Sequence, residues 1–245
     1  MNVVLSNFSA LMISKDFFIR DHMYLVTAAT HFEMEPFHAA CRHDGVHQLV
    51  TGIGPVETSV RLMALLNRLS GQIKGVVNFG VGGAYFDSSG SPKAGLLDIC
   101  LAESEVLGDF GVCLEGKIER ISGKGLEAPD TFVMDEGMIN LASQALQGKQ
   151  IPFHSGNFVT VSCTSGTAVR GSVLARQHEG ICENMEGAAV ARVCQEFHLP
   201  CLEIRCISNH VEDRDKSRWK LKQACRKSGE AAAVIVRYMV ENCHD

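Results

Sequence analysis

Two glutamates in the first part of the chain could activate a water molecule. Glu33 and Glu35 stand two residues apart, after an apolar run and before Pro36, which we expect to close a turn. A carboxylate that is fixed at the end of a strand can act as a general base. The position is equally typical of a helix start, where acidic side chains are favoured. The segment alone leaves both interpretations open.

A third glutamate and an asparagine could bind a sugar and a base. Glu186 opens a run of small residues that predicts a helix, and a carboxylate fixed there can accept hydrogen bonds from two neighbouring hydroxyls, as in ribose. Asn209 follows an apolar run, and its amide can donate to one heteroatom while accepting from another, as a purine edge requires. Taken singly, Glu186 could also be a helix charge and Asn209 a turn former.

A glycine-rich segment argues against a nicotinamide cofactor. Residues 78–85 read NFGVGGAY, and the third glycine of a dinucleotide-binding motif would have to stand where the chain has Tyr85. The glycines still permit close approach of a ligand to the backbone, although a tight turn explains them nearly as well.

Composition excludes several partners. The chain has 245 residues and a net charge of −5, without a lysine- or arginine-rich run, so polymeric nucleic acid is not the expected partner. No stretch approaches the roughly 20 apolar residues of a membrane span. We therefore expect a small-molecule ligand and no membrane partner.

The ten cysteines are scattered singly, without a CxxC pair. They are typical of small buried hydrophobic residues in a reducing compartment, and we expect a cytoplasmic protein. His43 and His47 have helical spacing, but a zinc site would need two further ligands. We therefore predict neither a metal nor a cofactor.

Apolar runs alternate with helical patterns along the chain. The runs predict strands at 24–29, 46–51, 75–79, 96–101, 158–163 and 201–207. The patterns predict helices at 56–69, with Val56, Val60, Met63 and Leu66 on one face, and at 135–146, 185–197 and about 219–240. This order predicts one α/β domain over 23–245, with a largely parallel twisted sheet between helices. Residues 1–22 are expected to form an N-terminal extension of uncertain role.

Ligands of such sheets collect at the carboxyl ends of the strands. Polar side chains that follow four of the predicted strands should therefore converge, at 30–35, 80–85, 164–167 and 208–214.

Taken together, these segments resemble the nucleoside phosphorylase and nucleosidase superfamily from residue 24 onward. The specific matches are NMEGAA at 184–189 and IRCISN at 204–209, supported by TGIGPV at 51–56 and NFGVGG at 78–83. The resemblance implies a three-layer αβα sandwich with a twisted, mostly parallel mixed sheet. It also implies a purine nucleoside substrate and, because these nucleosidases are commonly dimers, a homodimer.

Within the superfamily the chain looks most similar to the futalosine hydrolases of menaquinone biosynthesis, through ATHFEMEP at 29–36 and SNHVEDR at 208–214. The resemblance implies that Glu33 deprotonates the attacking water, that Glu186 grips the 2′- and 3′-hydroxyls with Met185 against the sugar, and that Asn209 reads a 6-oxopurine. Relatives that cleave methylthioadenosine and S-adenosylhomocysteine carry Asp in place of Asn209. Further substrate contacts are expected from Gly80, Val81, Cys163, Thr164 and Ser208.

Three rivals stay open. A phosphorolytic enzyme would need cations at 30–36 and 80–85, where the chain has no Arg or Lys. A methylthioadenosine/S-adenosylhomocysteine nucleosidase would differ at Asn209, and one side chain does not decide between futalosine and its 6-amino analogue. A non-catalytic nucleoside-binding protein would be expected to lack Glu33.

Overall fold

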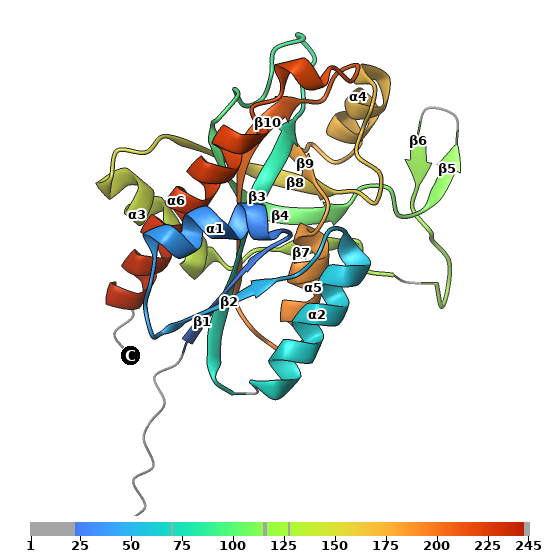
Figure 1. The fold of residues 1–245 in the computed structure, drawn as a ribbon. Coiled ribbons are helices and arrows are strands. Elements are labelled where there is room, and N and C mark those ends of the chain that lie inside the picture. Colours follow the sequence, from blue (N-terminus) through green and yellow to red (C-terminus); the bar gives the residue numbers. More distant parts are fainter. Residues whose placement is uncertain (1–22, 70, 115–116, 127, 243–245) are drawn as a thin grey trace, which may run out of the picture.

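The computed structural model describes residues 23–69, 71–114, 117–126 and 128–242 (Figure 1). The predicted extension, 1–22, lies outside the described residues. Eight strands form the main sheet: β1 (Met23–Ala28), β2 (Val46–Val50), β3 (Ile73–Ala84), β4 (Ile99–Leu107), β7 (Thr131–Val133), β8 (Phe153–Thr160), β9 (Cys182–Asn184) and β10 (Cys201–His210). A separate hairpin is formed by β5 (Val112–Leu114) and β6 (Lys117–Glu119).

The sheet is mixed and mostly parallel, as predicted. Its order is β10-β4-β8-β9-β3-β1-β2, with β7 beside β4. Parallel pairing joins β2 to β1, β1 to β3, β3 to β10, β4 to β8 and β8 to β9. Antiparallel pairing joins β10 to β4, β3 to β9 and β4 to β7. Because β3 pairs with both β9 and β10, five of the strands close into a ring, which the sequence did not predict.

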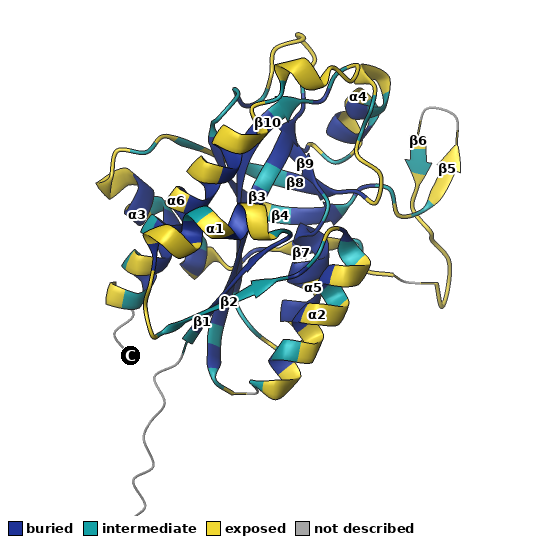
Figure 2. Ribbon diagram, viewed as in Figure 1, coloured by how far each residue is buried: buried dark blue, intermediate teal, exposed yellow. Residues whose placement is uncertain are grey.

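Helices cover both faces of the sheet, which confirms the layered α/β architecture. The helices are α1 (His31–Ala40), α2 (Pro55–Arg68), α3 (Glu136–Gly148), α4 (Ala168–Gln177), α5 (Gly187–Glu196) and α6 (Leu221–Asn242), with a short 3-10 helix at Lys216–Arg218. One core cluster joins the sheet to α1, α3 and α6, and a second joins it to α2 and α5. Figure 2 shows the central strands of the main sheet buried between helices whose outer faces are exposed, while the edge strand β2 is half-buried.

Two predicted strands run further than expected. β3 continues to Ala84 and β10 to His210, so Gly80, Val81, Ser208 and Asn209 belong to strands and not to the loops after them. The carboxyl ends of β4 and β8 also shift, to Leu107 and Thr160. Patterns of apolar residues did not reveal α4 or the three-residue strands β5, β6, β7 and β9, which are too short to show a period.

Two local expectations were wrong. Pro36 does not close a turn but lies inside α1, whose first turn is already fixed by a cap. In α2 the predicted apolar face is largely exposed, with Val56 73%, Val60 62% and Met63 40% exposed. Leu66, the fourth residue of the predicted face, is buried, and it makes the core contacts of that helix together with Thr58 and Leu62.

None of the described helices is both long and apolar enough to cross a membrane.

Candidate active site

A cavity of about 390 Å3 lies where β1, β3 and β10 end. The residues that line it include seven that the sequence predicted: Glu33, Val81, Thr164, Met185, Glu186, Ser208 and Asn209. Two predicted residues do not line it. Gly80 lies behind the cavity wall, where an added Cβ would stand 2.7 Å from both Glu33 Oε1 and Arg205 Nη1. Cys163 is exposed, and its N–H donates to Asp109 Oδ2 at 3.2 Å.

Glu33 caps a helix and also faces the cavity. Thr30 is the N-cap of α1, and its hydroxyl accepts the Glu33 N–H at 3.2 Å. In return, Glu33 Oε2 accepts the Thr30 N–H at 3.1 Å and the Thr30 hydroxyl at 2.8 Å, which completes a capping box. The Val81 N–H reaches Oε1 from β3 at 3.2 Å. The two interpretations of Glu33 are therefore compatible, because the cap holds the carboxylate in place.

Burial makes Glu33 a stronger base. The side chain is 5% exposed, and desolvation raises the pKa of its carboxyl above the ordinary value, although Arg205 and the Thr30 hydrogen bond oppose the shift. A carboxylate with a raised pKa accepts a proton more readily.

Glu186 is fixed at the start of α5, as its N-cap residue. Its Oε1 accepts the Gly54 N–H at 3.0 Å, and its Oε2 accepts from Arg205 Nη1 at 3.3 Å. Gly54 has a φ of +87°, in the left-handed region that favours glycine, so the turn before α2 can aim this N–H at the carboxylate. One lone pair on each oxygen remains for a ligand.

Arg205 forms ion pairs with the acidic side chains of the site, and the sequence did not predict it as a site residue. It is 2% exposed and donates to Glu203 Oε1 at 2.8 Å, to Glu186, and to the Val81 carbonyl at 3.2 Å. The neighbouring carboxylates Glu203, Glu186 and Glu33 outweigh desolvation and raise the pKa of its guanidinium. One feature of the sequence could have revealed it: Glu203 and Arg205 are opposite charges two residues apart inside an otherwise apolar strand.

Asn184 organises the same helix start. Its Oδ1 accepts the N–H groups of Glu186 at 2.9 Å and of Gly187 at 2.8 Å, while its Nδ2 donates to the buried Glu105 at 2.5 Å. Burial raises the pKa of Glu105 well above its usual range. The amide thus sets the direction in which Glu186 leaves the helix.

Ser208 and Asn209 form the end of β10. The Ser208 hydroxyl donates to Asn209 Oδ1 at 2.8 Å, and Asn209 Nδ2 donates to the His210 carbonyl at 3.1 Å. These bonds fix the plane of the amide and leave one N–H and one lone pair for a ligand. At the rim, Arg214 lies 5.1 Å over the ring of Trp219, and both residues line the cavity.

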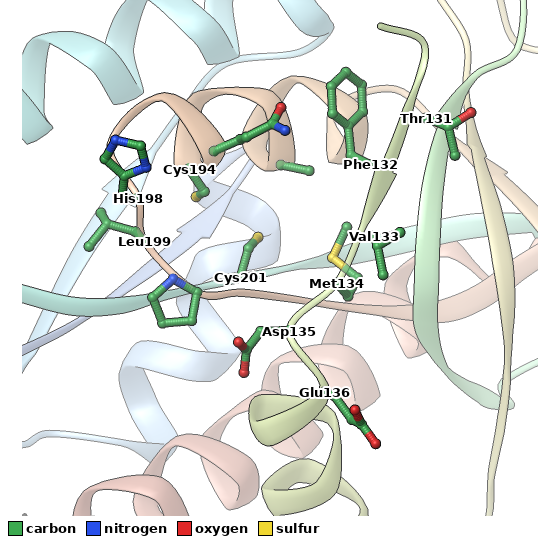
Figure 3. Close-up of a pocket in the computed structure, with 13 residues that line it drawn as sticks. Thr131, Phe132, Val133, Met134, Asp135, Glu136, Cys194, His198, Leu199 and Cys201 are labelled. Atoms are coloured by element: carbon green, nitrogen blue, oxygen red, sulfur yellow. The ribbon is translucent and has the colours of Figure 1, made fainter.

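A second hollow, of about 660 Å3, lies between β7 and the end of α5. Figure 3 shows its residues, which include Asp135, Glu136 and His198. Asp135 is used as the N-cap of α3, and its Oδ1 accepts the Met138 N–H at 2.8 Å. No predicted site residue lies among those that line this hollow, so the chemistry-bearing side chains converge in the smaller cavity.

Comparison with known proteins points to one superfamily. Residues 40–241 match the phosphorylase superfamily. The futalosine hydrolase of Thermus thermophilus is 31% identical over 188 residues, covering 74% of this chain and 76% of that protein. The futalosine hydrolase of Streptomyces coelicolor is 28% identical over 185 residues, covering 74% of each.

A solved structure with the same fold is the 5′-methylthioadenosine/S-adenosylhomocysteine nucleosidase from Helicobacter pylori with butyl-thio-DADMe-Immucillin-A. It is similar with a TM-score of 0.75 at 18% identity, covering 89% of this chain and 98% of that chain. At this identity the likeness concerns the fold alone.

Proposed function

The chain belongs to the phosphorylase superfamily, and from this premise we propose that it hydrolyses the N-ribosyl bond of futalosine or its 6-amino analogue in menaquinone biosynthesis. The observation that carries the proposal is the single cavity in which Glu33, Glu186 and Asn209 meet. The two futalosine hydrolases that the chain resembles over about three quarters of its length support the choice of nucleoside.

Bond cleavage builds positive charge on the ribose, as in the oxocarbenium-like transition state of glycoside hydrolysis. Glu186 holds the 2′- and 3′-hydroxyls through its free lone pairs, and Met185 packs against the sugar. Glu33 takes a proton from water as the oxygen bonds to C1′ and the bond from C1′ to the base breaks. The leaving base gains a proton on N7 from solvent, and Asn209 accepts the N7–H while donating to O6.

Hydrolysis is favoured over phosphorolysis. Among the described residues that line the cavity, the cationic side chains are Arg205 and Arg214. Arg205 is already paired with Glu203 and Glu186, so its charge is not free for phosphate. Arg214 lies over Trp219 at the rim, outside the segments 30–36 and 80–85 in which a phosphorylase would need its cations. We also expect action in the cytoplasm, because the nine described cysteines are all free, as in a reducing compartment.

The decisive assay is release of free base from futalosine, aminofutalosine, methylthioadenosine and S-adenosylhomocysteine in phosphate-free buffer, followed by chromatography with mass detection. Turnover confined to the first two supports the proposal. Efficient cleavage of the last two would assign the protein to the methylthioadenosine nucleosidases, and cleavage that requires added phosphate would make it a phosphorylase.

Asn209→Asp is expected to shift the preference from hypoxanthine toward adenine nucleosides. An aspartic acid can donate a proton to N7 of adenine, which the neutral amide cannot do. The measurement is the ratio of kcat/KM for the 6-oxo and 6-amino forms of one nucleoside. If the ratio stays constant, Asn209 does not read the base.

We propose that the protein is a homodimer, and we expect a dimeric mass in light scattering. The exposed apolar side chains Ile53, Val56, Val60 and Met63 support this, because they gather on α2 and the turn before it. Ile53 also lines the cavity, so a partner seated there would lie close to the substrate. A monomeric mass at micromolar concentration would contradict the proposal.

A further inference from the structure

The strands β9, β3 and β10 are neighbours in the sheet (Figure 1). They place two polar side chains at one part of the cavity. In the parallel pair of β3 and β10, Gly83 is the partner of Asn209. In the antiparallel pair of β3 and β9, the same glycine is the partner of Glu183. Paired residues carry their side chains on the same face of a sheet, and all three residues line the cavity. Glu183 and Asn209 therefore stand on either side of a residue without a side chain.

The missing side chain at Gly83 lets neighbouring side chains converge there. A Cβ added at Gly83 would stand 3.0 Å from Val211 Cγ2, 3.1 Å from Asn209 Nδ2 and 3.5 Å from Glu183 Cγ. Because neighbouring strands lie about 4.8 Å apart, the backbones of β9 and β10 are separated by about 10 Å here. Because Glu183 and Asn209 both line the cavity, a flat heterocycle bound in it can turn one polar edge toward the two side chains.

The Glu183 carboxylate is buried and held in a fixed direction. It is 5% exposed; its Oε1 accepts the Ser165 N–H at 2.8 Å, and its Oε2 accepts the Tyr85 hydroxyl at 3.2 Å. Tyr85, which replaces the third glycine of the dinucleotide-binding motif, is itself fully buried. Each carboxylate oxygen keeps a second lone pair, so Glu183 can accept one more hydrogen bond from a ligand. The hydrolytic steps described above leave this group unused.

We infer that Glu183 is a specificity-determining residue that accepts the N1–H of a 6-oxopurine, while Asn209 binds the O6 and N7 side of the same base. A 6-oxopurine carries hydrogen on N1, whereas N1 of adenine carries only a lone pair. An ionised carboxylate therefore attracts the first ring and repels the second. This inference rests on the proposed function and narrows it to nucleosides of hypoxanthine.

The direct test is binding of free hypoxanthine and free adenine to wild type and Glu183→Gln by isothermal titration calorimetry. The buffer is mildly alkaline, because burial raises the pKa of Glu183 above its usual value and the carboxyl must be ionised. Wild type is expected to prefer hypoxanthine, and the variant to lower the hypoxanthine-to-adenine affinity ratio by roughly 10- to 100-fold, the usual worth of a hydrogen bond to a charged group. A ratio within about twofold of wild type would overturn the inference.

A modified base tests the contact between N1–H and Glu183 in the wild-type protein, so the test does not depend on folding of a variant. 1-Methylhypoxanthine lacks the N1–H, so methylation should weaken binding to wild type much more than binding to Glu183→Gln. Equal losses in the two proteins would place N1 away from Glu183. If Glu183→Gln does not fold by circular dichroism, wild type decides alone: equal affinity for the methylated and unmethylated bases overturns the inference.

Two further variants separate recognition from general damage. Tyr85→Phe removes the hydrogen bond that the Tyr85 hydroxyl donates to Glu183 and should lower the affinity ratio by about 2- to 10-fold. Glu196→Gln changes an exposed carboxylate on α5 and should leave the ratio unchanged. Base release from futalosine is measured on the same samples. If wild type releases base from futalosine but the hypoxanthine-to-adenine affinity ratio is the same in wild type and Glu183→Gln, this inference alone is wrong. If wild type releases base from no nucleoside, the proposed function is wrong.

Discussion

Glu33→Gln is expected to lower kcat by roughly 10²- to 10⁴-fold, the usual contribution of a positioned general base. The amide cannot take a proton from water, yet it keeps the size of the side chain. It also keeps the helix cap, because Gln serves as well as Glu at the third position of a capping box. Stability and nucleoside affinity should therefore change little, so the loss can be assigned to chemistry.

The pH profile provides an independent readout of Glu33→Gln. Only ionised Glu33 can act as a base, and its raised pKa places the loss of activity on acidification above the ordinary range of a glutamate. Wild-type kcat/KM should therefore rise with pH through the Glu33 pKa, and the variant should lose this limb. Glu35→Gln is the matched control, because Glu35 is exposed on the same helix and does not line the cavity. Equal rates for wild type and Glu33→Gln would remove Glu33 from the mechanism.

The sequence predicted the layered fold because its longer elements have clear patterns. Continuous apolar runs such as those of β1 and β10 are typical of strands covered on both faces, and their ends located Glu33 and Asn209. The ring of strands was not predictable, because it depends on β9, a three-residue strand inserted antiparallel beside β3. A strand of that length carries no period.

For the same reason, the position of Glu183 opposite Asn209 could not be read from the sequence. Their pairing with a common glycine is a property of the sheet register, and no local pattern encodes it. The exposure of one face of α2 was not predictable for a different reason. Val56, Val60 and Met63 follow the spacing of a buried stripe, but hydrophobic spacing does not say which surface covers it.

Arg205→Met is expected to lower the free energy of unfolding by about 3–5 kcal/mol, the usual cost of removing one partner of a buried ion pair. Methionine fills most of the volume but leaves Glu203 and Glu186 without their cation; both are at most 4% exposed. Turnover should fall as well, since Arg205 helps to orient Glu186. Arg205→Lys restores the charge without the planar guanidinium, so its stability should lie between those of wild type and Arg205→Met.

The measurement is urea denaturation. Arg192→Met is the matched control, because Arg192 pairs with Glu196 at the surface and such pairs contribute less than about 1 kcal/mol. Equal losses for the buried and the exposed arginine would mean that the ion pairs of Arg205 do not hold this site together.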